Sequence, residues 1–189
     1  FRILHGSQAR VYQLALDDGS PLTVSGNDGG LLPAPVALTH AWLGIGERLD
    51  LLLDFTDHPA GARVMLTSLP FNAGVEGTAR QGIGMELLEL VVAPGPPRED
   101  PPLPAVLSTV PALGAPSAER FFEFSSGNAA GSHLINGLSY DMNRVDEQVR
   151  LGQTERWTFR NSSGIPHPIH LHGTQFQVES RSDGRNEVF

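Results

Sequence analysis

The chain has 189 residues, enough for one large domain or two small ones. Its formal net charge of -8 disfavours phosphate backbones and anionic lipid headgroups, so we expect no nucleic-acid partner. No apolar run approaches the roughly 18 residues of a membrane span. With no cysteine, these residues supply no disulfide, no thiolate ligand and no cysteine nucleophile.

The two ends of the chain suggest that it is part of a longer protein. It begins with Phe1 inside a strand-like stretch, Phe1-Arg2-Ile3-Leu4, that lacks the charged and apolar regions of a signal peptide. It stops on Glu187-Val188-Phe189, apolar residues typical of a strand that continues. We interpret the chain as a fragment.

The first 93 residues read as short strands separated by turn signals. From Arg48 onward, one face of an extended chain carries Leu49, Leu51, Leu53 and Phe55, and the other carries Arg48, Asp50 and Asp54, which predicts a strand buried on one face. The Asp-Gly step in Asp17-Asp18-Gly19-Ser20 predicts a hairpin. An antiparallel sandwich of about six strands fits best, with strands expected at 11–16, 21–25, 48–55, 62–69 and 84–92.

A proline-rich stretch then separates two strand-forming regions. Residues 94–116 hold eight of the fifteen prolines, a density that neither a helix nor a central strand accepts. We therefore predict a linker over 94–118 and a second β domain over 119–189, too short for a complete sandwich. Its strands are expected at 121–124, 133–136, 148–151 and 154–160.

Three of the seven histidines lie together in His167-Pro168-Ile169-His170-Leu171-His172-Gly173. On a regular strand, His170 and His172 share one face, roughly 7 Å apart, and His167 faces the other way. This parity predicts two metal centres on opposite sides of one strand. Imidazole suits copper, zinc, iron or nickel, so the ligands alone do not choose the metal.

Two other interpretations compete with this metal assignment. The histidines could cluster by chance in a turn fixed by Pro166 and Pro168. A zinc hydrolase would continue the pattern as His-x-His-x-Asp-His, but Thr174-Gln175-Phe176 supplies neither residue. An all-β context also lacks the α/β layers that such hydrolases usually need.

The histidine segment with Thr174-Gln175-Phe176 resembles the third-domain signature of the multicopper oxidases, in particular the bacterial three-domain type that includes laccases and cuprous oxidases. Supporting stretches are Gly152-Gln153-Thr154-Glu155-Arg156-Trp157, Ile135-Asn136-Gly137 with Asp141-Met142-Asn143, and Gly46-Glu47-Arg48-Leu49-Asp50 with Asp54-Phe55. The resemblance implies cupredoxin-like Greek-key β-sandwich domains: a copper-free middle domain over 1–93 and the incomplete start of a copper-binding domain over 119–189.

The resemblance also implies copper as cofactor and a role for each clustered histidine. His167 looks like a type 1 ligand, His170 like a type 2 ligand and His172 like a type 3 ligand. The family completes these centres with a cysteine and histidines absent here, so we expect this chain alone to hold no complete copper site and to be inactive. We expect His5, His40, His58 and His133 to be structural or solvent-exposed.

The implied activity of the intact protein is one-electron oxidation of phenolic, aromatic or metal-ion substrates, coupled to four-electron reduction of dioxygen to water. Its partners would be a small-molecule reductant, dioxygen, and the first domain and C-terminal part of the same protein, in the periplasm or outside the cell. The scattered Met65, Met85 and Met142 favour a laccase-like role over dedicated cuprous oxidation. The rival is a non-enzymatic scaffold or binding protein of the cell-division type; such relatives lose the histidines that this chain keeps.

Overall fold

The computed structural model describes residues 1–72, 81–96, 100–127 and 132–182, which form two compact units. The first takes in the described residues up to Val110 and from Pro168 onward, and the second those from Pro111 to His167. All regular secondary structure in the described residues is β-strand, so the predicted all-β class is confirmed. These residues include no helix long and apolar enough to cross a membrane. The domain boundaries inferred from sequence stay a prediction.

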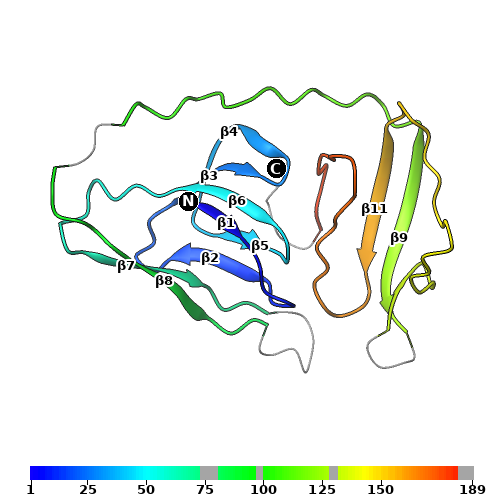
Figure 1. The fold of residues 1–189 in the computed structure, drawn as a ribbon, viewed down its shortest axis with the longest axis horizontal. Helices are drawn as coiled ribbons and strands as arrows, with labels where there is room; N and C mark the ends of the chain where they lie inside the picture. Colours follow the sequence, from blue (N-terminus) through cyan, green and yellow to red (C-terminus); the bar gives the residue numbers. More distant parts are fainter. Residues whose placement is uncertain (73–80, 97–99, 128–131, 183–189) are drawn as a thin grey trace. The chain divides into compact units, whose positions relative to one another are not determined.

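The first unit consists of two four-stranded antiparallel sheets (Figure 1). One has the strand order β1-β6-β3-β4 and the other β5-β2-β7-β8. The strands are β1 (Arg2–Leu4), β2 (Tyr12–Leu16), β3 (Leu22–Asn27), β4 (Gly30–Leu38), β5 (Ala41–Leu43), β6 (Arg48–Leu52), β7 (Arg63–Ser68) and β8 (Met85–Val91).

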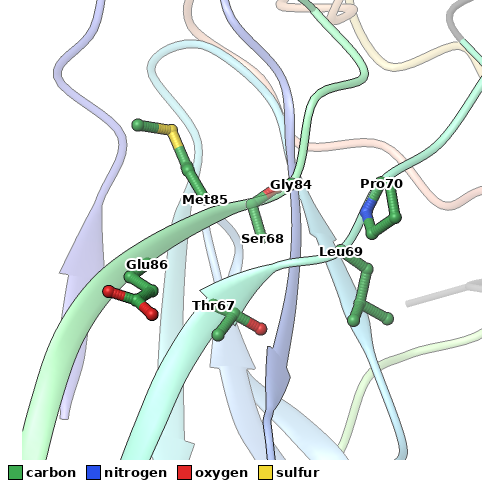
Figure 2. Close-up of a pocket in the computed structure, with 7 residues that line it drawn as sticks. All are labelled: Thr67, Ser68, Leu69, Pro70, Gly84, Met85 and Glu86. Carbon is green, nitrogen blue, oxygen red and sulfur yellow. The ribbon is translucent and has the colours of Figure 1, made fainter.

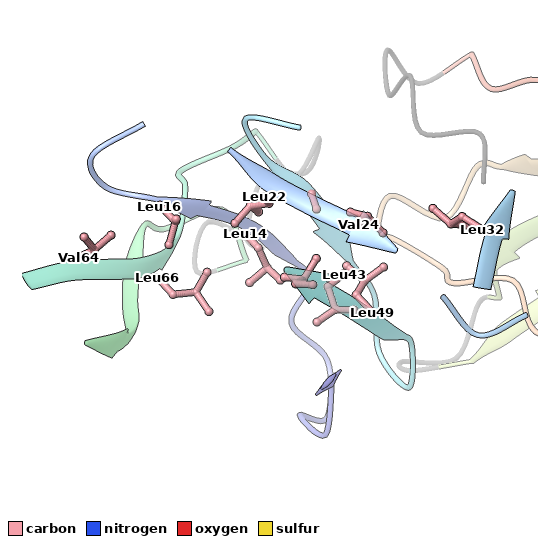
Figure 3. Packing of buried hydrophobic residues seen from close by; sticks show 11 residues of the cluster. Leu14, Leu16, Leu22, Val24, Leu32, Leu43, Leu49, Val64 and Leu66 are labelled. Carbon is pink, nitrogen blue, oxygen red and sulfur yellow. The ribbon is translucent and has the colours of Figure 1, made fainter. Parts of the chain in front are cut away.

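Both sheets contribute to one aliphatic core. Leu49 and Leu51 of β6 are buried, as the alternation predicts, and Leu53 and Phe55 beyond the strand pack against the same cluster. In β3 and β7, buried positions likewise alternate with more exposed ones. Figure 3 shows the side chains of the buried cluster gathered between strands of the two sheets. The buried cluster comprises Leu14, Leu16, Leu22, Val24, Leu32, Ala41, Leu43, Leu49, Leu51, Val64 and Leu66.

The predicted hairpin at Asp17-Asp18-Gly19-Ser20 is wrong. β2, which precedes this turn, pairs with β5 and β7, whereas β3, which follows it, pairs with β4 and β6. The turn therefore joins the two sheets. A hairpin forms at the next turn instead, between β3 and β4, where the Gly29 backbone N–H donates to Asn27 Oδ1 at 2.8 Å.

The proline-rich stretch has no strand in its described residues 94–96 and 100–117, but part of it is hydrogen-bonded to β4. The Ser108 hydroxyl lies 2.9 Å from the Leu31 carbonyl oxygen and 3.0 Å from that of Leu32. The Leu107 N–H donates to the Pro33 carbonyl at 2.9 Å. These bonds use acceptors of β4, the outermost strand of its sheet.

The second unit has one three-stranded sheet, in the order β10-β9-β11. Its strands are β9 (Ala118–Ser126), β10 (His133–Ile135) and β11 (Glu155–Asn161). β9 and β11 run parallel, side by side in Figure 1, and β10 is antiparallel to β9. Phe122 of β9 is the one buried hydrophobic side chain among the described residues of this unit.

The strand predicted at 148–151 is not formed. Residues 148–150 have no regular structure, and a turn begins at Leu151, followed by Gly152 with a φ of 80°. The Arg120 guanidinium donates to the Gln148 carbonyl at 2.7 Å. The Arg120 side chain of β9 is thus hydrogen-bonded to the Gln148 carbonyl, which in a sheet would accept a backbone N–H from a neighbouring strand.

Candidate metal centre

The Ile135-Asn136-Gly137 stretch is a structural turn that extends the edge of β9. Asn136 has a φ of 50°, in the left-handed region that asparagine tolerates well. Its Oδ1 accepts the Glu123 backbone N–H at 2.8 Å, and its Nδ2 donates to the Phe121 carbonyl at 3.1 Å. This side chain therefore replaces a strand partner where β10 ends.

Glu155 and Trp157, in the stretch Gly152-Gln153-Thr154-Glu155-Arg156-Trp157, anchor the loop before β11. The Arg120 guanidinium donates to both carboxylate oxygens of Glu155, at 2.6 and 3.1 Å, and also binds Glu147. The Trp157 indole N–H donates to Glu155 at 2.8 Å. The hydrogen bonds from Arg120 and Trp157 lower the pKa of Glu155. The charge network fixes the end of the sheet where β11 begins.

His167 lies at the other end of β11, in a group of aromatic rings. After Asn161 the chain turns: the Ser162 N–H donates to the Phe124 carbonyl at 2.8 Å, and Gly164 has a φ of 76°. The His167 ring stacks on Phe124 with centroids 5.3 Å apart and planes 21° apart. Phe124 in turn stacks on Phe159, so the imidazole continues the aromatic row of the sheet.

Two polar side chains also contact the His167 ring. His133, the first residue of β10, meets it edge to face with centroids 5.7 Å apart. The Ser163 hydroxyl oxygen lies 2.7 Å from His167 Nε2. Burial lowers the pKa of His167, and electrostatic repulsion from His133 lowers it further. Both effects favour the neutral imidazole that binds metals.

His170 and His172 lie in the first unit and do not form the predicted strand. Residues 165–171 have no regular structure, and a turn follows at His172 and Gly173, where φ is 77°. Pro166 and Pro168 lack the N–H groups that a strand ladder needs. Strand parity therefore does not place His167 on the face opposite His170 and His172. The two rings nevertheless lie close, with centroids 4.8 Å apart and planes at 79°.

The other histidines differ in their surroundings. His5 is buried and stacks on Tyr12, and His58 Nε2 lies 2.7 Å from Asp18 Oδ2. Both have the structural contacts expected of them. His133 is exposed, as predicted, but its contact with His167 escaped the sequence because the two residues are 34 positions apart. The pairing of β10 with β9 and the turn after β11 together bring them into contact.

A surface depression of the first unit lies between the end of β7 and the start of β8 (Figure 2). Glu86 is its one ionisable lining residue. It offers no imidazole, so it adds nothing to the candidate centre. Its lining comprises Thr67, Ser68, Leu69, Pro70, Gly84, Met85 and Glu86.

Comparison with known proteins places this architecture in a class. Residues 114–188 match the family model for multicopper oxidases. A solved multicopper oxidase, McoA from Aquifex aeolicus, has 29% sequence identity and a TM-score of 0.83, covering 99% of this chain and 42% of its own. A multicopper oxidase from Campylobacter jejuni, described as a metallo-oxidase, has 25% identity and a TM-score of 0.77, with 93% and 39% covered. The fold is therefore cupredoxin-like.

Curated relatives extend this similarity along the chain. A cell division protein FtsP from Dickeya dadantii is 34% identical, covering 97% of this chain and 38% of its own length. A laccase from Bacillus subtilis is 30% identical, with 96% and 36% covered, and a bilirubin oxidase from Albifimbria verrucaria is 31% identical, with 98% and 34% covered. The family match, the relatives and the structures together support a multicopper oxidase-type chain. It spans less than two fifths of the length of these relatives.

The three clustered histidines fit copper ligation by the chemistry of their donor atoms. Imidazole nitrogen is a good copper ligand. Among the residues that the structure describes, no hydrogen bond from another residue engages His167 Nδ1 or the rings of His170 and His172. Within the described ranges, no three His, Cys, Asp or Glu side chains come together as a metal-holding group.

Proposed function

We propose that this chain contributes three copper ligands to a copper-dependent oxidase: His167 to a type 1 centre, His170 to a type 2 centre and His172 to a type 3 centre. The parent protein would remove one electron from each of four equivalents of a phenol, aromatic amine or low-valent metal ion. The four electrons and four protons would convert one dioxygen into two waters. Bound copper would supply the one-electron redox chemistry.

The observation that carries the proposal is the difference between the two histidine environments. His167 is half-buried against Phe124, and its pKa is lowered by burial. His170 and His172 are exposed, with centroids 4.8 Å apart. A ligand held among aromatic rings suits a centre shielded from water, whereas two adjacent imidazoles suit neighbouring metal positions.

The chain's own part in the reaction is to hold and orient these imidazoles. Phe124 covers one face of the His167 ring and keeps water from it. The thiolate that a blue copper centre uses would come from elsewhere in the parent, because the 189 residues contain no cysteine.

Metal analysis and a visible spectrum of the purified parent test the proposal. We expect bound copper, the intense absorption of a thiolate–copper centre, and oxygen uptake when a phenol is supplied. A folded parent that takes up no copper would contradict the oxidase. Cell fractionation tests the related proposal that the parent acts in the periplasm or outside the cell.

The second candidate function is a non-enzymatic scaffold or binding protein of the cell-division type. The similarity to FtsP, 34% identical over 195 residues, favours it. The parent sequence beyond residue 189 separates the two candidates. A His-Cys-His motif there favours the oxidase, and its absence favours the scaffold.

A further inference from the structure

We propose that Asn161 and Ser163 are positioning residues that fix the proton of neutral His167 on Nε2 and leave the Nδ1 lone pair for a ligand. The metal part of this inference rests on the proposed function, whereas the position of the proton does not. Hydrogen-bond donors and acceptors of Asn161, Ser163, Ile165 and His167 meet at the end of β11.

The side-chain amide of Asn161 has one hydrogen-bond donor group and one acceptor atom. Its Nδ2 donates to the Ile165 carbonyl oxygen at 2.6 Å, which fixes the orientation of the amide because a carbonyl can only accept. Oδ1 is therefore left as an acceptor. It receives the Ser163 backbone N–H at 3.0 Å and faces the Ser163 hydroxyl oxygen at 2.8 Å.

The Ser163 hydroxyl has a single proton to donate. Asn161 Oδ1 has no proton to give, so the 2.8 Å contact uses the proton of Ser163. The Ile165 carbonyl is a poorer alternative acceptor, because it lies 3.4 Å from the hydroxyl oxygen. The Ser163 oxygen is then an acceptor toward its remaining neighbours, which are the Ile165 backbone N–H at 3.4 Å and His167 Nε2.

The Ser163 oxygen determines which ring nitrogen of His167 carries the proton. His167 Nε2 lies 2.7 Å from the Ser163 oxygen, and since the serine proton is committed to Asn161, Nε2 must carry the shared proton. A neutral imidazole has one N–H, so Nδ1 holds a lone pair. Phe124 against the ring face and His133 at an edge-to-face contact restrain the ring plane. Proteins commonly orient a metal-binding histidine by a hydrogen bond from the ring N–H that does not face the metal.

Long-range ¹H–¹⁵N NMR spectra of the ¹⁵N-labelled 189-residue chain test this arrangement. They should be recorded well above the ordinary histidine pKa of about 6.5, so that the ring is neutral. We expect His167 as the Nε2–H tautomer, with an Nε2 proton that exchanges slowly with water. Ser163→Ala should speed that exchange about tenfold, the usual effect of losing one hydrogen bond. Ser163→Thr keeps the hydroxyl and should restore slow exchange.

Ser162→Ala is the matched control, because the Ser162 hydroxyl donates to Glu123 Oε1 at 2.7 Å and not to His167. A proton on Nδ1 in the wild-type chain would overturn the inference. Equal exchange rates in Ser163→Ala and Ser162→Ala would overturn it as well. If Ser163→Ala does not fold, the wild-type tautomer decides. A parent with this tautomer but no copper would refute the proposed function and leave the positioning role standing.

Discussion

Phe122→Ala should unfold the second unit under conditions in which the first stays folded. Phe122 is 6% exposed and packs against Trp157 and Phe159, with ring centroids 4.8 and 5.3 Å away. Truncating a buried phenylalanine costs about 3–5 kcal/mol. The free energy of unfolding of a whole domain is only about 5–15 kcal/mol. No other described hydrophobic residue of this unit is buried.

Phe121 provides the matched comparison, because it is the adjacent residue of β9 but 51% exposed. Burying a whole phenylalanine gains roughly 1.5–3 kcal/mol, so Phe121→Ala should cost about 1 kcal/mol. Urea unfolding followed by the fluorescence of Trp157 measures both values. Trp42→Phe as the background removes the other tryptophan, which lies in β5 of the first unit. Equal shifts for the two alanine variants would refute the assignment of Phe122 as the centre of this small core.

Two further predictions concern polar contacts. Asn136→Ala should lower the free energy of unfolding of the second unit by about 1–3 kcal/mol in the same assay. The reason is that the Glu123 N–H and the Phe121 carbonyl both lose the side chain to which they are hydrogen-bonded. An unchanged unfolding midpoint would contradict this. Burial raises the pKa of Asp18, but hydrogen bonds from Ser20 and His58 outweigh it and hold the pKa below the ordinary 3.8. The carboxylate therefore stabilises the fold above that pH and loses its contribution as the pH falls through the lowered pKa. The stability difference between wild type and Asp18→Asn should be present at about pH 5 and disappear by about pH 2, and a difference that grows in acid would contradict this.

Strands with strict alternation could be predicted from the sequence, whereas strands that contain proline could not. The pattern from Arg48 onward identifies β6 because Leu49 and Leu51 alternate with Arg48 and Asp50, and the sandwich buries the face that carries the two leucines. β4 was missed because Pro33 and Pro35 interrupt its pattern. Proline is tolerated there since β4 lies at the edge of its sheet, where one side of the strand needs no ladder donors.

The same contrast between local and long-range information holds for the candidate site. The clustering of His167, His170 and His172 is visible in the sequence, but the strand assumed beneath them does not form. His133 and Phe124 reach His167 through the pairing of β10 with β9 and the turn after β11, neither of which a local motif encodes. Ser163 is close in sequence, yet its role depends on the amide orientation of Asn161.

The central claim is that His167 and His172 serve different copper centres, and paired substitutions in the intact parent test it most directly. Stopped-flow spectroscopy of His167→Ala and His172→Ala would follow reduction by substrate and reoxidation by dioxygen. His167→Ala should abolish or strongly alter the blue absorption, because it opens the type 1 centre. His172→Ala should keep the colour but fail to reoxidise after substrate has reduced it. Equal bleaching in both variants, or full dioxygen reduction by His172→Ala, would contradict the division of roles.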